Sequence, residues 1–263
     1  MPSFLKIPKN QIIAALLLLL IATSSKLGIS LALLLFVLCV GFTIGADVFF
    51  TYLRRRVVFL PYSAIITGLI LTLIIDPSAM WYQIAIIAAA AMAIKNFIRP
   101  LGRHIFNPAA SGLLIGWVVF GLQPSWWAAS AYNPTSFFAL TNLPVLIPIL
   151  LIGCISLYRY RRYASAVLYV VVYCLLLFLT NLSVSLTSAA LTILSIGTLF
   201  YTFLMLVEPM TSPVNKRRQV LYGAVVAAGT VALVHLQKIW GIAIFDVSLT
   251  ALLLGNLLFF KFR

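Results

Sequence analysis

Long apolar stretches dominate the sequence, and the charged residues are confined to short clusters between them. A helix needs about 20 consecutive apolar residues to cross a bilayer. The two longest uncharged stretches, 104–158 and 163–207, are each long enough for two such helices. The pattern predicts ten membrane-spanning helices, at 11–25, 27–46, 57–75, 78–95, 108–122, 143–158, 164–180, 185–206, 219–236 and 242–260.

The composition supports this interpretation. Hydrophobic residues make up 63% of the 263 residues and charged residues 8%, whereas about a quarter of a soluble domain is charged. A disordered chain is excluded because such chains are poor in hydrophobic residues. We therefore expect an all-α integral membrane protein in which residues 1–263 form one membrane domain without a separate catalytic domain.

The basic residues predict an orientation. Lys and Arg number 18 against four acids, but they occur in small clusters between apolar segments, so we expect a lipid bilayer and not a nucleic acid as the partner. On the ten-helix pattern, sixteen lie on one side of the membrane: Lys6, Lys9, Arg54, Arg55, Arg56, Lys95, Arg99, Arg103, Arg159, Arg161, Arg162, Lys216, Arg217, Arg218, Lys261 and Arg263. Only Lys26 and Lys238 lie on the other. The positive-inside rule then predicts a multi-pass protein of the cell membrane with both termini in the cytoplasm.

The two halves, about 1–130 and 131–263, resemble each other in inverted orientation. An acid followed by proline ends the third and the eighth predicted helices, at Asp76 and Glu208. Asn107 and Asp246 precede the fifth and the tenth, and both are favoured helix N-cap residues. The capped helices are about 15 residues or about 22 Å long, shorter than a bilayer core of about 30 Å. Short helices at matching positions of inverted halves indicate a binding site near the membrane midplane.

The expected ligand of such a site is anionic or electron-rich, because helix N-termini carry partial positive charge. Arg103 and His104 directly precede the first cap, and Pro108 and Ser111 follow it, so these four residues and Asn107 are binding candidates. The alternative is that the basic residues only set topology and that the caps only begin helices.

Polar side chains within or beside apolar segments are candidates for an ion path, because they are costly to place in a membrane. These are Asp76, Glu208, Asp246 and Asn256. Their alternative roles are turn formation and close helix packing. No metal site is expected, since the three cysteines form no CxxC motif and the two histidines lie at opposite faces.

Four segments together resemble a known family: TGLILTL at 67–73, FNPAA at 106–110, EPMTSP at 208–213 and LLLGN at 252–256. Their order and spacing are similar to those of the RnfD and NqrB proteins, membrane subunits of the Rnf electron transport complex and of the sodium-pumping NADH:quinone oxidoreductase. The resemblance covers the chain from about residue 50. It implies a ten-helix membrane subunit that transfers electrons through bound flavin, often coupled to Na⁺ or H⁺ movement, within a complex of membrane, flavin and iron–sulfur subunits.

The resemblance also implies FMN or riboflavin as the cofactor. Many family members carry FMN on a threonine of an SGAT-like motif in the loop after the fifth helix. The corresponding loop here, 123–138, has no such motif, so noncovalent flavin is expected and Thr135 is the best available acceptor if a covalent link exists. Trp126 and Trp127 of this loop could stack on the flavin ring or form an interfacial aromatic belt.

Two other functions remain open at this point. Inverted halves with short helices meeting at the midplane suit a channel or transporter for a small solute or ion equally well, because a fold does not fix a function. A redox-inactive scaffold is the third possibility, since the attachment motif is missing.

Overall fold

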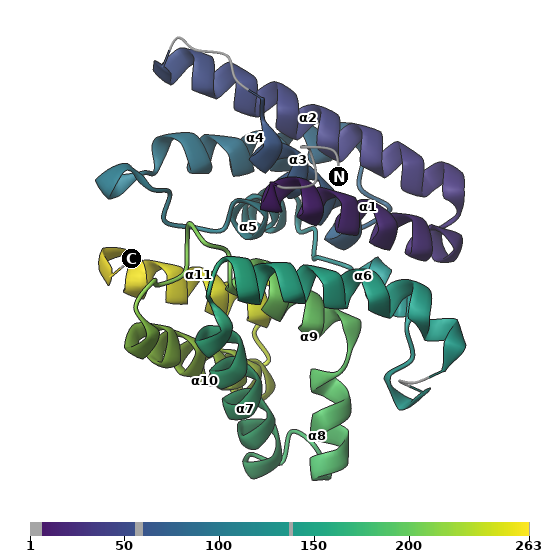
Figure 1. Cartoon of the computed structure of the whole chain (residues 1–263), viewed down its shortest axis with the longest axis vertical. Helices are drawn as coiled ribbons and strands as arrows, with labels where there is room; N and C mark the ends of the chain where they lie inside the picture. Colours follow the sequence, from purple (N-terminus) through teal and green to yellow (C-terminus); the bar gives the residue numbers. More distant parts are fainter. Residues whose placement is uncertain (1–6, 56–59, 137–138, 263) are drawn as a thin grey trace.

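A computed structural model describes residues 7–55, 60–136 and 139–262. Within these ranges every regular element is a helix, as Figure 1 shows. The apolar helices and their composition confirm the expected class, an all-α membrane protein.

The first half of the chain forms five helices, which lie together in the upper part of Figure 1. They are α1 (Pro8–Leu27), α2 (Ile29–Arg55), α3 (Tyr62–Ile74), α4 (Trp81–Phe97) and α5 (Pro108–Phe120). The connection from α5 to the second half is a loop with short 3₁₀ turns, among them η3 (Trp127–Ala131).

The second half contains the same kind of elements with two irregular helices. It consists of α6 (Leu143–Cys154) continued by the π-helix η6 (Ile155–Arg159), α7 (Tyr163–Leu179), α8 (Leu186–Ile193), α9 (Ile196–Phe200) continued by the π-helix η7 (Tyr201–Leu206), α10 (Lys216–Trp240) and α11 (Val247–Phe259). The helix pair formed by α8 and α9–η7 is bent by 55°. Ser195 makes this break, because its hydroxyl accepts a hydrogen bond from Thr198 N and starts a new helix.

Each predicted span coincides with one helix or one bent pair among the described residues, although their lengths differ. By length and composition, four helices can cross a membrane: α1, α2, residues 140–159 containing α6, and α10. The bent pair can form a fifth span. The remaining apolar helices, α3, α4, α5, α7 and α11, are shorter. The expectation of short capped helices is met at α5 and α11, which have 13 residues each.

One predicted boundary is wrong. The second span was expected to end at residue 46, before the charge of Asp47, but α2 continues through Asp47 to Arg55. The Asp47 side chain is fully buried inside the protein. Its partners on α4 satisfy the carboxylate, so the charge does not stop the helix.

The two halves pack in the same order. In the first half α2 packs on α4 and α4 on α5, and in the second half α7 packs on α10 and α10 on α11. The helices α1 and α6, the first of each half, pack against each other and join the halves. A glycine permits close approach at matching contacts: Gly112 of α5 against Ile87 of α4, and Gly255 of α11 against Val226 of α10. This agreement supports the predicted repeat, which stays a prediction.

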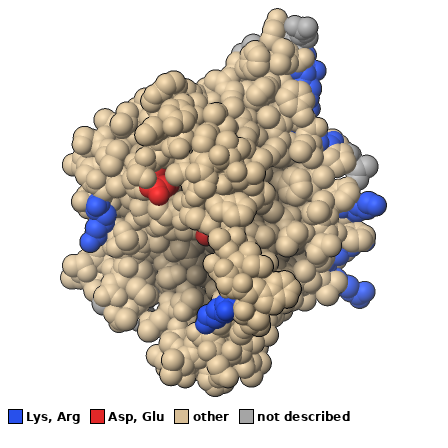
Figure 2. Space-filling view, turned by 180° about the vertical axis from the view of Figure 1, so that it is seen from behind, with Lys and Arg blue, Asp and Glu red and all other residues tan. Residues whose placement is uncertain are grey.

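Charge is distributed unevenly over the surface. Figure 2 shows most of the visible Lys and Arg side chains along one edge of the molecule and others apart from it, while most of this face is uncharged. Lys6, Arg56 and Arg263, which the sequence places on the basic side, lie outside the described residues. All four acidic residues lie within them.

Candidate functional site

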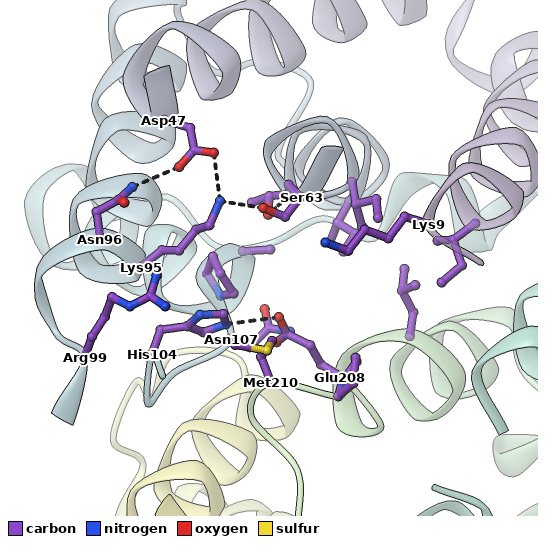
Figure 3. A pocket seen from close by; sticks show the side chains of 18 of the residues that line it. Lys9, Asp47, Ser63, Lys95, Asn96, Arg99, His104, Asn107, Glu208 and Met210 are labelled. Carbon is purple, nitrogen blue, oxygen red and sulfur yellow. Dashed lines mark hydrogen bonds and ion pairs between the residues drawn. The ribbon is translucent and has the colours of Figure 1, made fainter. Parts of the chain in front are cut away.

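A cavity of about 450 Å³ lies among the helices of the first half. Its walls come from α1 to α5 and the loop before α5. The second half borders it with Ser156 of η6, Tyr160, Leu204 of η7 and residues 207–210. This volume falls within the range of small-molecule sites, roughly 300–1,000 Å³. Figure 3 shows polar side chains from separate helices and loops directed into this space.

A buried ion pair forms one wall of the cavity. Lys95 Nζ of α4 lies 2.9 Å from Asp47 Oδ2 of α2 and donates to Ser63 Oγ of α3 at 2.6 Å. Asn96 Nδ2 donates to the other Asp47 oxygen at 2.9 Å, and Thr51 Oγ1 donates to Asn96 Oδ1 at 3.1 Å. Both carboxylate oxygens are therefore bonded, and the network ties three helices together.

A buried ion pair is stable only when both partners are present and their remaining donors and acceptors are hydrogen-bonded. Removing charges from water is expensive, and the mutual attraction offsets this only when hydrogen bonds satisfy the remaining donors and acceptors. Asp47 is 0% exposed and Lys95 7%. Because both of its carboxylate oxygens are bonded, Asp47 can be buried within the apolar helix α2.

Glu208 forms the second polar cluster of the cavity. Asn107 Nδ2 donates to Glu208 Oε2 at 3.0 Å, and Thr211 Oγ1 donates to the same oxygen at 3.1 Å. His104 Nε2 lies 3.3 Å from Glu208 Oε1. The Asn107 side chain has a second role, because its Oδ1 accepts from Ala110 N and caps α5. Glu208 of the second half is thereby joined to the short helix of the first.

Two residues hold the Glu208 loop in place. Arg162, which is buried, donates from Nε to Ser212 Oγ at 3.0 Å, and Ser212 Oγ in turn donates to the Glu208 carbonyl at 2.7 Å. Gln219 Nε2 donates to Val214 O at 2.9 Å. The sequence assigns Arg162 only to membrane topology, whereas the structure shows it as a positioning residue for this loop.

The cavity also has an apolar wall. Ile66 and Ile70 of α3 line it from the first half, and Leu204 of η7 lines it from the second half. Tyr160, after η6, contributes an aromatic side chain; burial and, to a smaller extent, the charge of Glu208 raise the pKa of its hydroxyl. The cavity thus combines a charged side with an apolar side.

The other capped helix has a different surrounding. Asp246 Oδ1 accepts from Leu249 N and caps α11. Its other oxygen accepts from Trp126 Nε1 at 2.7 Å, and Trp127 Nε1 donates to Thr72 O at 2.7 Å. Asp76, after α3, accepts from Ser78 N and Ser78 Oγ in a local turn. A pocket of about 10 Å³ is lined by Trp126 together with residues of α1, α3 and α9.

The predicted site residues therefore divide into separate groups. The structure brings His104, Asn107, Pro108 and Glu208 to the cavity. Asp246, Trp126 and Trp127 lie together with the C-terminal end of α3, and neither indole lines the cavity.

The remaining candidates lie elsewhere. Arg103 is exposed and does not line the cavity. Ser111 is buried and donates to Pro108 O within α5. Thr135 is exposed and donates to Asn133, and Asn256 accepts from Tyr222 OH between α10 and α11. No group of three His, Cys, Asp or Glu side chains suited to a metal ion occurs in the part of the chain that the structure describes.

Sequence reasoning did not identify Asp47 and Lys95 as a site. A signal for them existed, since Asp47 is one of only four acids and lies, like Lys95, at the edge of an apolar stretch. An ionisable residue in such a place is a candidate for a functional role by default. The sequence does not show that these two residues pair, because they lie on different helices, α2 and α4.

The fold and the site together define an all-α membrane protein with a partly charged internal cavity. The chain belongs to the NQR2, RnfD, RnfE family, whose family model matches residues 5–260. This confirms the resemblance found in the motifs.

Two proteins, each named as the D component of an ion-translocating oxidoreductase complex, illustrate the similarity. The protein of Shewanella denitrificans is 38% identical over 68 residues, which are 26% of this chain and 19% of that protein. The protein of Salmonella arizonae is 37% identical over 67 residues, which are 25% of this chain and 19% of that protein. The matched segment thus spans about a fifth of these curated relatives.

Proposed function

We propose that this protein is a membrane subunit of an ion-translocating electron-transfer complex. Its family membership and the names of its relatives support this proposal. Partner subunits that carry flavin or iron–sulfur groups would deliver and accept the electrons. The basic edge in Figure 2 supports an orientation in the cell membrane with this edge and both termini in the cytoplasm.

The cavity beside α5 is the proposed place of a noncovalently bound flavin. The observation that carries this proposal is the joint lining of one cavity by His104, Asn107 and Glu208 on one side and by Ile66, Ile70 and Leu204 on the other. A flavin has a planar, largely apolar ring with polar edges, and this wall arrangement suits both parts. A bound flavin would supply one-electron and two-electron redox chemistry.

The chain's own contribution would be positioning and insulation. Asn107 fixes the Glu208 carboxylate at the N-terminus of α5, and the apolar residues would restrict water around the ligand. Glu208 is the carboxylate proposed for coupling to Na⁺ or H⁺, because it lines the cavity and its side chain remains 21% exposed. Asp76, Asp246 and Asn256 remain further candidates for an ion path.

Purification of the full chain from flavin-replete cells tests the proposal. We expect a yellow protein whose flavin absorbance is released by denaturation, because nothing in the loop 123–138 matches the attachment motif. A Thr135→Ala variant serves as the control and should retain the same amount of flavin. Flavin that stays attached to the wild type after denaturation but not to the variant would show a covalent link.

The same preparation distinguishes the alternatives. A colourless protein that moves solute into liposomes would contradict electron transfer and support a transporter. A colourless protein without transport activity would favour a scaffold. Iron–sulfur or flavin subunits that copurify would support membership in a redox complex.

A further inference from the structure

The carboxylates of the cavity are fully engaged. Asp47 is bonded to Lys95 and Asn96, and Glu208 is bonded to Asn107 and Thr211 beside His104. The other two acids of the sequence, Asp76 and Asp246, do not line the cavity. No Asp or Glu of this chain is therefore left to neutralise further positive charge there.

The cavity nevertheless carries four more cations. Lys9, Arg54, Arg55 and Arg99 line it, and none of them forms an ion pair among the residues that the structure describes. Figure 3 shows Lys9 and Arg99 directed toward the space between the Asp47 and Glu208 clusters. An anion from another molecule would neutralise this excess.

Two of these cations also have a buried donor that finds no acceptor within the described ranges. Arg54 Nε and Arg99 Nε are shielded from solvent and lack a hydrogen-bond partner among the described residues; Arg99 donates from a terminal nitrogen to Gly102 O at 2.7 Å. Burial, and then the charge of Arg55, lower the pKa of Arg99. Buried donors are normally satisfied, so their state here points to a missing acceptor.

We infer that the cavity binds the phosphate group of an amphipathic ligand, held by Arg54 and Arg99, with the apolar part of the ligand against Ile66 and Ile70. A phosphate provides three strong acceptor oxygens and close to two charges, which suits a cluster of guanidinium groups better than a single carboxylate does. The inference rests on the proposed function where the ligand is a flavin, which would then be FMN. A phospholipid headgroup offers the same phosphate chemistry.

Titrations with FMN and riboflavin test this inference, because the two differ only by the phosphate. The full chain is purified in dodecylmaltoside without added lipid, and binding is followed by flavin fluorescence. We expect FMN to bind at least about tenfold more tightly than riboflavin, since a hydrogen bond to a charged group contributes about a factor of ten or more. Inorganic phosphate should compete with FMN and leave riboflavin unaffected.

The variants Arg99→Gln and Arg54→Gln should each weaken FMN binding about tenfold and leave riboflavin binding unchanged. Arg217→Gln, an exposed residue outside the cavity, is the matched control and should leave both affinities unchanged. Thermal melting and size-exclusion profiles establish that the variants are folded. The phosphate competition on the wild type needs no variant, so it remains decisive if one of them fails to fold.

The outcomes separate the inference from the proposed function. Equal affinities for FMN and riboflavin would overturn the phosphate site and leave flavin binding intact. If neither flavin binds but phosphatidylglycerol copurifies with the wild type and is lost from Arg99→Gln, the phosphate site stands and the flavin proposal is wrong. If neither flavin nor phospholipid is bound, both are wrong.

Discussion

The short helices α5 and α11 have similar sequence signals and different surroundings. Each begins at an N-cap side chain, Asn107 or Asp246, and each has 13 residues. At α5 the cap contacts Glu208 and opens onto a cavity of about 450 Å³. At α11 the cap contacts Trp126, and Asp246 does not line that cavity.

The difference lies in the partner that each cap finds. Glu208 reaches across to the cap of the opposite half, whereas Asp76 bonds to Ser78 in its own turn. The indole of Trp126 takes the corresponding place at Asp246. Two similar caps therefore have different surroundings, because a carboxylate meets the cap that borders the cavity and an indole meets the other.

The largest effect is expected from the ion pair, which lines the cavity at the α5 end. Lys95→Met leaves Asp47 buried and uncompensated, so we expect a loss of about 3–5 kcal/mol of unfolding free energy. Adding Asp47→Leu should recover most of this loss, because replacing a whole buried pair by apolar residues is often neutral. Lys238→Met, an exposed change, should alter stability by no more than about 0.5 kcal/mol. Denaturant titration in detergent measures all three, and failure of the double variant to recover would contradict the assignment.

The acid–proline turns at Glu208 and Asp76 should contribute differently to the free energy of unfolding. Glu208→Ala removes the acceptor of Asn107 and Thr211 and the partner of His104, and we expect a loss of about 2–3 kcal/mol. Asp76→Ala removes only the local turn to Ser78 and should cost about 1 kcal/mol or less. Melting temperatures of both variants in the same detergent provide the measurement. Equal losses would contradict the comparison, because they would mean that the turns at Glu208 and Asp76 contribute equally to stability.

A smaller effect than that of Glu208→Ala is expected at the α11 end. Trp126→Phe keeps the aromatic ring and removes one hydrogen bond to Asp246, so we expect about 1.5 kcal/mol of destabilisation. Flavin affinity should not change, because Trp126 does not line the cavity. A large loss of bound flavin in this variant, seen by absorbance, would support the predicted stacking role of the indole and shift the site to this end.

The fold was largely predictable because its signals are local. Apolar stretch length predicted the helices, and Asn107 and Asp246 predicted where α5 and α11 begin, since a cap acts within one turn of its own helix. The wrong end predicted for the second helix, at residue 46, shows the limit of this reasoning. A charge was taken as the end of a span, but Lys95 and Asn96, about 50 positions later, satisfy it.

The candidate site was predictable only in part. His104, Asn107 and Glu208 were singled out by motif and position, and the structure joins them across the two halves. Arg162 was assigned to topology because nothing near it in the sequence indicates that its guanidinium reaches Ser212. Trp126 was considered for a flavin, while its indole is bonded to Asp246.

The sequence by itself determined that this is a membrane protein, where its helices lie, and most of the polar residues of the candidate site. These follow from hydropathy and charge, which are properties of single residues and short segments. Only the tertiary structure decided which acids meet which cations, which cap borders the cavity beside α5, and which basic residues of that cavity have no acidic partner among the described residues. Those outcomes depend on distances between helices far apart in the chain, and these distances are set by packing.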